Sequence, residues 1–132
     1  MNKKHVTALA TTVLLAISGV TAGGAQAAPF EPALPLSPAS QQNALRAAKQ
    51  YLEMTAYSHD GLIKQLEYEQ YSAEDATYAA DNVNADWNQQ AARAAKQYLD
   101  MTAYSHGGLV SQLEYEGYTS AQAEYGVAAA GL

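Results

Sequence analysis

The feature that most constrains this chain is an internal duplication with a spacing of 47 residues. Residues 44–85 align with residues 91–132 without a gap, and 24 of the 42 aligned positions are identical. All ten tyrosines fall into five pairs whose members lie 47 residues apart. Periods of this length are typical of a supersecondary unit that packs against its own copy. The chain is therefore predicted to fold as two similar units in tandem.

Each unit is predicted to contain three short helices. In the first unit, apolar residues recur at helical spacing in three segments, and Ser58 and Ser72 stand at the starts of the second and third segments as typical N-caps. Gln70 in the first copy and Gly117 in the second mark the end of the middle helix. The expected buried stripes are Ala44, Leu45, Ala48, Tyr51, Leu52 and Thr55, then Leu62, Ile63 and Leu66, then Ala76, Ala79, Ala80 and Val83. The fold class is predicted to be all-α, with two tandem three-helix repeats that resemble a helix-turn-helix.

Two residue pairs indicate where the third helices begin. Ser72 with Asp75, and Thr119 with Gln122, have the spacing of an N-cap and the third helical residue, but only the second pair meets the strict capping-box pattern. The stripes are mostly alanine, so one unit of about 42 residues could hardly fold alone. Two units packed together could.

Residues 82–86 are expected to form a short joint between the units, or a kink in one longer helix. Asp86 with Gln89 starts the pattern again, and the single tryptophan, Trp87, follows directly. A buried tryptophan stabilises a fold by several kcal/mol, about 3–5 on truncation. We expect Trp87 to pack across the joint.

The first residues predict export. Lys3 and Lys4 precede an apolar run over residues 6–20, and Ala25-Gln26-Ala27 has the form of a cleavage site. This order is typical of a secretory signal peptide, and the run is shorter than the roughly 20 residues that span a bilayer. We predict cleavage near Ala27 and a secreted or cell-surface protein, with an uncleaved anchor as the alternative. The predicted organisation is a signal peptide (1–27), a Pro-rich linker (28–42), repeat 1 (43–85) and repeat 2 (86–132).

Prolines recur at every third position of the linker, which suits an extended polyproline II segment. A stiff spacer is the simpler interpretation, and a proline motif for a partner is the alternative. The prolines are Pro29, Pro32, Pro35 and Pro38.

Charge and cysteine content exclude several function classes. Cleavage after residue 27 would leave five basic and 13 acidic residues, a net charge of −8. Such a surface repels nucleic acid and attracts basic partners. The chain has no cysteine, so disulfides, cysteine-based metal sites and thiol catalysis are excluded. DNA binding is disfavoured because the helix-turn-helix would need a basic recognition face.

The histidines give only a weak signal for chemistry. His59 and His106 occur once per unit without a second histidine at metal-binding spacing, so exposed first-turn positions are expected. Ser58-His59-Asp60 suggests a catalytic triad, but adjacent residues at a helix start point in different directions. We expect no catalytic residue, no metal and no cofactor, and therefore no enzyme.

Acidic pairs that flank a tyrosine are the strongest repeated polar feature. They occur in Glu67-Tyr68-Glu69 and again in Glu114-Tyr115-Glu116 near the end of each middle helix. Glu69 and Glu116 are expected at the helix boundary, with Lys49 and Lys96 as possible partners, while the tyrosines face outward. A solvated charged face is the simpler alternative to a binding site. The predicted binding residues are Glu67, Tyr68, Glu69, Glu74, Asp75, Asp81, Glu114, Tyr115 and Glu116.

Several short motifs together resemble the Ltp family of host cell-surface-exposed lipoproteins. They are Ala-Lys-Gln-Tyr-Leu (48–52, 95–99), Tyr-Ser-(x)3-Leu (57–62, 104–109), Gln-Leu-Glu-Tyr-Glu (65–69, 112–116), Ala-Asp-Trp-Asn (85–88) and Gln-Ala-Glu-Tyr-Gly-Val (122–127). The resemblance implies tandem helix-turn-helix-like units and superinfection exclusion, in which a surface protein of a resident phage blocks injection of phage DNA. It implies the tape-measure protein of the incoming phage as partner, met through an acidic surface. Lipoprotein members carry a cysteine after the signal peptide, and this chain has none.

Two functions follow as hypotheses. The first is an exported interaction protein that blocks injection of phage DNA by binding a basic phage protein. The second is an extracellular envelope-binding module for a host cell-wall ligand or basic protein. Neither hypothesis involves nucleic acid as partner, and the sequence leaves the oligomeric state open.

Overall fold

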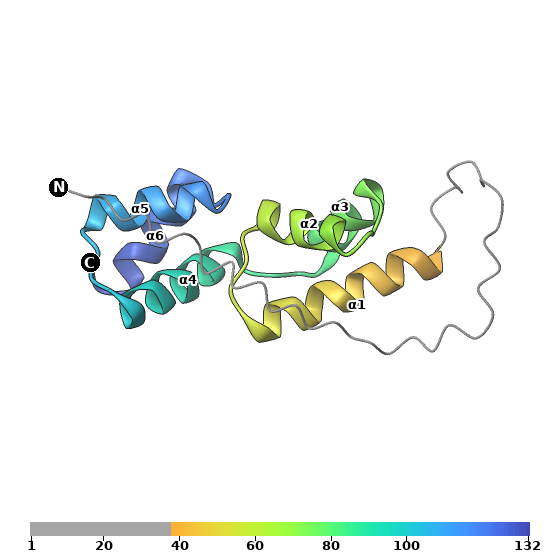
Figure 1. Cartoon of the computed structure of the whole chain (residues 1–132), viewed down its shortest axis with the longest axis horizontal. Coiled ribbons are helices and arrows are strands. Elements are labelled where there is room, and N and C mark those ends of the chain that lie inside the picture. Colours follow the sequence, from red (N-terminus) through yellow and green to blue (C-terminus); the bar gives the residue numbers. More distant parts are fainter. Residues whose placement is uncertain (1–37) are drawn as a thin grey trace. The chain divides into compact units, whose positions relative to one another are not determined.

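The computed structural model describes residues 38–132, which form six helices and no strand (Figure 1). The helices are α1 (Pro38–Met54), α2 (His59–Tyr68), α3 (Ala73–Asn82), α4 (Trp87–Met101), α5 (His106–Tyr115) and α6 (Ser120–Ala129). None of these helices has the length and apolar character that a membrane span needs. The predicted signal peptide and residues 28–37 of the predicted linker lie outside the described residues. The predicted all-α fold is confirmed.

The six helices form two similar three-helix units (Figure 1). In the first unit α3 packs against both α1 and α2, and in the second unit α6 packs against both α4 and α5. Helices related by 47 residues therefore occupy equivalent places. This arrangement confirms the two tandem three-helix repeats.

Side-chain caps begin the second and third helices of each repeat. The Ser58 hydroxyl accepts a hydrogen bond from the Gly61 N–H at 2.8 Å, and the Ser72 hydroxyl accepts one from the Asp75 N–H at 3.1 Å. Thr119 and Gln122 form the full capping box, with both reciprocal hydrogen bonds present. Each cap contributes about 1 kcal/mol to stability. The predicted caps are confirmed.

The turns after α2 and α5 reverse the chain through left-handed residues. Gln70 has a φ of 71° and Gly117 has a φ of 98°. In each case the next amide donates back to a leucine carbonyl in the helix, from Tyr71 to Leu66 at 3.1 Å and from Tyr118 to Leu113 at 3.2 Å. Gly117 adopts this conformation without strain, whereas a side chain makes it costly by roughly 1 kcal/mol. Both predicted helix ends are confirmed.

The core of the first repeat is small and built largely from alanine. Its fully buried residues are Ala44, Ala48, Leu62, Leu66, Ala76, Ala79 and Ala80. Trp87, the first residue of α4, packs against this core from the second repeat, and its ring meets the His59 ring edge to face with centroids 5.4 Å apart. The predicted packing of Trp87 across the joint is confirmed.

Helix α1 begins at Pro38, within the segment 28–42 that the sequence assigned to the linker. Proline is well suited to the first position of a helix because its φ is already helical and its missing N–H would be unpaired there. The added first turn lies beside α3, where the Ser40 hydroxyl donates a hydrogen bond to the Asp75 carboxylate. The helical repeat therefore starts five residues earlier than residue 43.

Close approach of α4 and α6 depends on Gly126. A Cβ atom at this position would lie 2.5 Å from the Ala91 carbonyl carbon and 2.6 Å from its oxygen. Both are backbone atoms and cannot move without shifting the helix. The equivalent residue in the first repeat is Ala79, so α1 and α3 accommodate a methyl group at this place.

Substitution Gly126→Ala is expected to destabilise the protein by about 2 kcal/mol, because overpacking outweighs the gain in helix propensity. Urea unfolding followed by circular dichroism measures the change. Ala79→Gly, the matched substitution in the first repeat, is expected to cost about 2 kcal/mol, through lost helix propensity together with loss of a buried methyl group. A neutral or stabilising Gly126→Ala would contradict the packing argument.

Candidate interaction surface

The first Glu-Tyr-Glu motif lies on the surface at the end of α2. Tyr68 follows the buried Leu66 by two residues, which turns its side chain about 200° away around the helix. It is 61% exposed, although a side chain as large as tyrosine is normally mostly buried. Glu67 and Glu69 beside it are exposed as well. The sequence prediction for these three residues therefore agrees with their positions.

The second motif presents its tyrosine even more openly. Tyr115 at the end of α5 is 81% exposed. Glu114 is exposed too, and its carboxylate accepts a hydrogen bond of 2.6 Å from the Ser120 hydroxyl at the start of α6. This bond orients one carboxylate oxygen and leaves the group at the surface. Each repeat thus exposes a tyrosine next to at least one carboxylate.

Glu116 corrects the predicted site. Its side chain is partly buried and accepts a hydrogen bond from the Tyr98 hydroxyl, which in turn accepts one from the Gln112 amide at 3.2 Å. Burial raises the pKa of Glu116 from 4.5 to about 7. The group turns inward to Tyr98 instead of pairing with Lys96. Glu116 is therefore not a fixed negative charge on the surface, although its sequence counterpart Glu69 is exposed.

Asp75 is the second correction. It is only 4% exposed, and one carboxylate oxygen accepts the hydrogen bond from Ser40. The early start of α1 brings Ser40 over this group, which the sequence boundary at residue 43 did not anticipate. A buried carboxylate that is bound within its own repeat cannot contact a partner. Glu74 and Asp81 on the same helix are exposed, as expected for surface acids.

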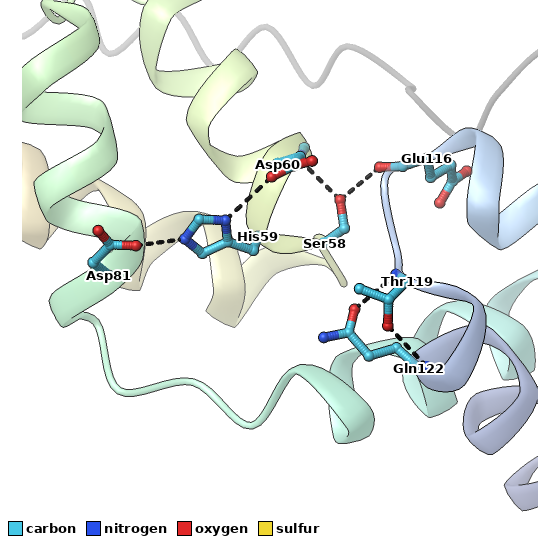
Figure 2. A network of polar contacts seen from close by, with 8 residues as sticks. Ser58, His59, Asp60, Asp81, Glu116, Thr119 and Gln122 are labelled. Carbon is cyan, nitrogen blue, oxygen red and sulfur yellow. Dashed lines mark hydrogen bonds and ion pairs between the residues drawn. The ribbon is translucent and has the colours of Figure 1, made fainter.

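His59 ties α2 to α3. Its Nε2 lies 2.7 Å from Asp81 and its Nδ1 lies 3.2 Å from Asp60. Burial lowers the pKa of His59, but the hydrogen bonds to the two carboxylates outweigh it, and the pKa lies above its ordinary value of 6.5. Ser58 is turned away from the imidazole, because its hydroxyl is used elsewhere (Figure 2). The Ser58-His59-Asp60 sequence therefore does not form a triad in this structure.

The second repeat makes the same histidine link with a different acid. His106 lies 2.7 Å from Glu124 of α6, and this hydrogen bond raises the pKa of His106. Glu124 aligns with Thr77, whereas Asp81 aligns with Ala128. The two acids therefore sit four aligned positions, about one helical turn, apart. Sequence reasoning placed both histidines at exposed first-turn positions and missed these links, which no local spacing reveals.

The hydrogen bonds between the repeats were also missed. Ser58 is buried, and besides capping α2 its hydroxyl donates to the backbone carbonyl of Glu116 at 2.5 Å, as Figure 2 shows. Arg93 donates to the Leu52 carbonyl at 2.7 Å. Thr55 donates to the Gln97 side chain at 3.3 Å. We call these six residues the repeat junction. Their carbonyl acceptors leave no pattern in a sequence.

A family model and a solved structure both match this chain, and the two matches agree with each other. The family model of the host cell surface-exposed lipoproteins matches twice, over residues 39–83 and over residues 86–129. Among solved structures, the chain is similar to Ltp, a superinfection exclusion protein from the Streptococcus thermophilus temperate phage TP-J34. The match has 34% identity and a TM-score of 0.66, and it covers 70% of this chain and 97% of that one. A comparison with curated protein sequences found no match.

Substitution Glu116→Gln is expected to stabilise the protein at pH 8 and to change little at pH 4.5. A carboxyl group with a raised pKa holds its proton more tightly in the folded state, so stability falls as pH rises from 4.5 to about 7. Glutamine removes that loss, by about 1 kcal/mol at pH 8 after allowance for partial exposure. Urea unfolding at the two pH values measures it. Glu69→Gln is the matched control, and an equal gain there would contradict the assignment to Glu116.

Substitution Asp81→Ala is expected to remove about 0.5 kcal/mol of stability at pH 5.5 and almost none at pH 8.5. The protonated His59 is stabilised in the folded state, so its contribution is complete below 6.5 and is lost as pH rises through the raised pKa. Thermal unfolding at both pH values tests this. Asp100→Ala, at another exposed acid, should show no such difference between the two pH values.

Proposed function

Because the chain belongs to the family of host cell surface-exposed lipoproteins, we propose that it is an exported interaction protein that blocks injection of phage DNA. In this proposal the chain acts beyond the cytoplasmic membrane and binds a basic protein of the incoming phage, for which the tape-measure protein is the candidate. The superinfection exclusion protein of phage TP-J34, which shares its fold at 34% identity, supports this choice. The proposal does not require catalysis.

The observation that carries the proposal is the exposure of Tyr68 and Tyr115 beside surface carboxylates. Exposed aromatic rings are frequent energetic centres of protein interfaces, because they bury much area at low cost in side-chain entropy. Glu67 and Glu114 add negative charge next to each ring. A basic partner with some apolar surface would gain from both properties. The remaining exposed acids, Glu69 and Glu74 among them, would speed its encounter with the chain.

The net charge of the described residues supports a positively charged partner. Residues 38–132 carry 12 acidic and five basic side chains. A polymer of negative charge, such as nucleic acid, would be repelled. A basic protein would be attracted over roughly a Debye length, about 8 Å at physiological ionic strength. The binding should therefore weaken as salt is added.

The proposal requires that the chain stay at the cell envelope without a lipid attached to a cysteine. An uncleaved leader or a wall partner would hold the chain at the surface, since lipid attachment at a cysteine is not available. Fractionation of expressing cells shows where the chain is found. Exclusion requires that it remain with the cell envelope.

The test is infection of host cells that express the chain. Normal phage adsorption with at least a tenfold drop in infective centres is the expected result, because the block acts after adsorption. A fourfold variant should abolish protection. It combines Glu67→Lys and Glu114→Lys with Tyr68→Ala and Tyr115→Ala. Plaque counts and adsorption assays measure the two quantities.

A matched control separates this surface from charge in general. Glu53 and Asp100 are exposed, lie 47 residues apart and stand near the ends of α1 and α4. Their substitution by lysine makes the same change in net charge at other positions. Protection that survives in this control and is lost in the Glu-Tyr variant supports the assigned surface. Unchanged infection of cells carrying the native chain at their envelope would refute the function.

A further inference from the structure

The six residues of the repeat junction have counterparts 47 residues away, at the two ends of the tandem. Among the described residues, these counterparts do not join one repeat to another. We propose that the chain associates head to tail with further copies of itself by repeating this junction between molecules. The second repeat of one copy would dock on the first repeat of the next. This association is supported by the contacts within the chain, by their counterparts 47 residues away, and by a compensating pair of side-chain changes. It does not depend on the proposed function.

Within the chain, each repeat contributes one side of the junction. The first repeat supplies the Leu52 carbonyl and the hydroxyls of Thr55 and Ser58, from the end of α1 to the start of α2. The second repeat supplies the groups that face them, along α4 and at the turn after α5. These groups are Arg93, Gln97 and the Glu116 carbonyl. The junction is therefore directional, with different surfaces on its two sides.

Both sides recur at the open ends with the same residue types. The counterparts of the first side are Leu99, Thr102 and Ser105 in the second repeat. The counterparts of the other side are Arg46, Gln50 and Glu69 in the first repeat. Leu99 is partly exposed, and the five other residues are exposed. The side chains that would join two molecules therefore lie at the surface.

Arg46 is already oriented like its counterpart. The guanidinium of Arg93 donates to the Gln90 side chain three residues earlier, besides reaching the Leu52 carbonyl. Arg46 donates to the Asn43 side chain, also three residues earlier, at 2.5 Å. Asn43 and Gln90 occupy aligned positions, so both arginines are held against their own helix in the same way. Little side-chain entropy would be lost when Arg46 meets a carbonyl of another copy.

The steric fit depends on two positions where the repeats differ. At the internal junction, a Cβ at Gly117 would lie 3.1 Å from the Cβ of Asp60 and 2.9 Å from the Ser58 hydroxyl, so glycine is needed there. The open end has Gln70 at this position, which carries that Cβ. It would face Gly107, the counterpart of Asp60, which has none.

The two differences between the repeats compensate each other sterically. Inside the chain a glycine in the turn faces an aspartate, and between chains a glutamine in the turn would face a glycine. No atom lies within 4 Å of a Cβ built at Gly107, so this position is open in the single molecule. The missing side chain also gives the Ser105 hydroxyl room to move from the Gln70 Cβ. Loss of the Asp60 charge at this end further reduces repulsion toward the exposed Glu69.

Association of this kind is heterologous, so it extends into a row or closes into a ring. The internal junction is helped by the covalent joint, since short linkers create effective concentrations of about 1 mM. Separate molecules lack this help and pay for lost translational freedom. We therefore expect weak association in dilute solution and strong association where chains are crowded on a surface. A row of copies would present its Glu-Tyr motifs together and bind a long partner with avidity.

Sedimentation velocity on residues 28–132 tests the proposal. The weight-average sedimentation coefficient of the native chain is expected to rise with concentration up to about 1 mM. Gly107→Asp should weaken association at least tenfold, because it puts a carboxylate opposite Gln70. The same substitution should leave the fold intact, since the position is open and acids favour the first turn of a helix. Circular dichroism and thermal unfolding check this.

Restoration provides the specific control. The double variant Gln70→Gly with Gly107→Asp recreates the glycine-aspartate pairing of the internal junction and should regain association. Gln70→Gly also relieves a left-handed side-chain residue. If the double variant associates no better than Gly107→Asp alone, the added charge by itself explains the loss of association. That result would overturn the proposed contact between residues 70 and 107.

Cysteine cross-linking gives an independent measurement, because the chain has no cysteine of its own. Oxidation of the Gln70→Cys, Gly107→Cys double variant is expected to give a ladder of covalent oligomers. The control pair Gln70→Cys with Ala121→Cys places the second thiol on an exposed residue in the first turn of α6, at the far end of α5 from Gly107. A native chain that stays monomeric, with ladder formation no faster than in the control pair, would refute the proposal.

Discussion

The close approach of alanine-lined helices is the constraint on which this structure depends. In each repeat the first and third helices meet through residues as small as Ala44 and Ala79, or Ala91 and Gly126. Small side chains let the helix backbones come together and gain dispersion contacts, but each contributes little buried apolar area. The larger leucines lie mainly on the middle helices. Such a core leaves little surplus stability, so caps, the joint tryptophan and the contact between repeats all matter.

Nearly identical sequences acquire different environments in the two repeats. Glu69 and Glu116 end equivalent helices and each interacts with the aligned tyrosine, Tyr51 or Tyr98, yet Glu69 is exposed and Glu116 is partly buried. The start of α2 lies against the turn after α5, where the Ser58 hydroxyl donates to the Glu116 carbonyl. The asymmetry comes from position in the tandem. It gives Glu116 a raised pKa and removes it from the acidic surface.

The histidine links show a different use of the duplication. His59 and His106 are aligned, but the acids that bind them, Asp81 and Glu124, are not. Copying alone would have kept the same acid at the same position. The link from the second helix to the third is therefore maintained by different residues in the two repeats, at the place where the repeat sequences diverge most.

The sequence by itself determined the duplication, the three helices per unit, their caps at Ser58, Ser72, Asp86 and Thr119, and the outward direction of Tyr68 and Tyr115. These features depend on local spacing, and helical geometry converts spacing into direction. Tertiary structure alone decided that Asp75 is covered by the first turn of α1, that Glu116 is partly buried against Tyr98, and that Ser58 joins the repeats. Those outcomes depend on which backbone carbonyl or helix end approaches from elsewhere in the chain, and backbone groups are the same at every position of a sequence.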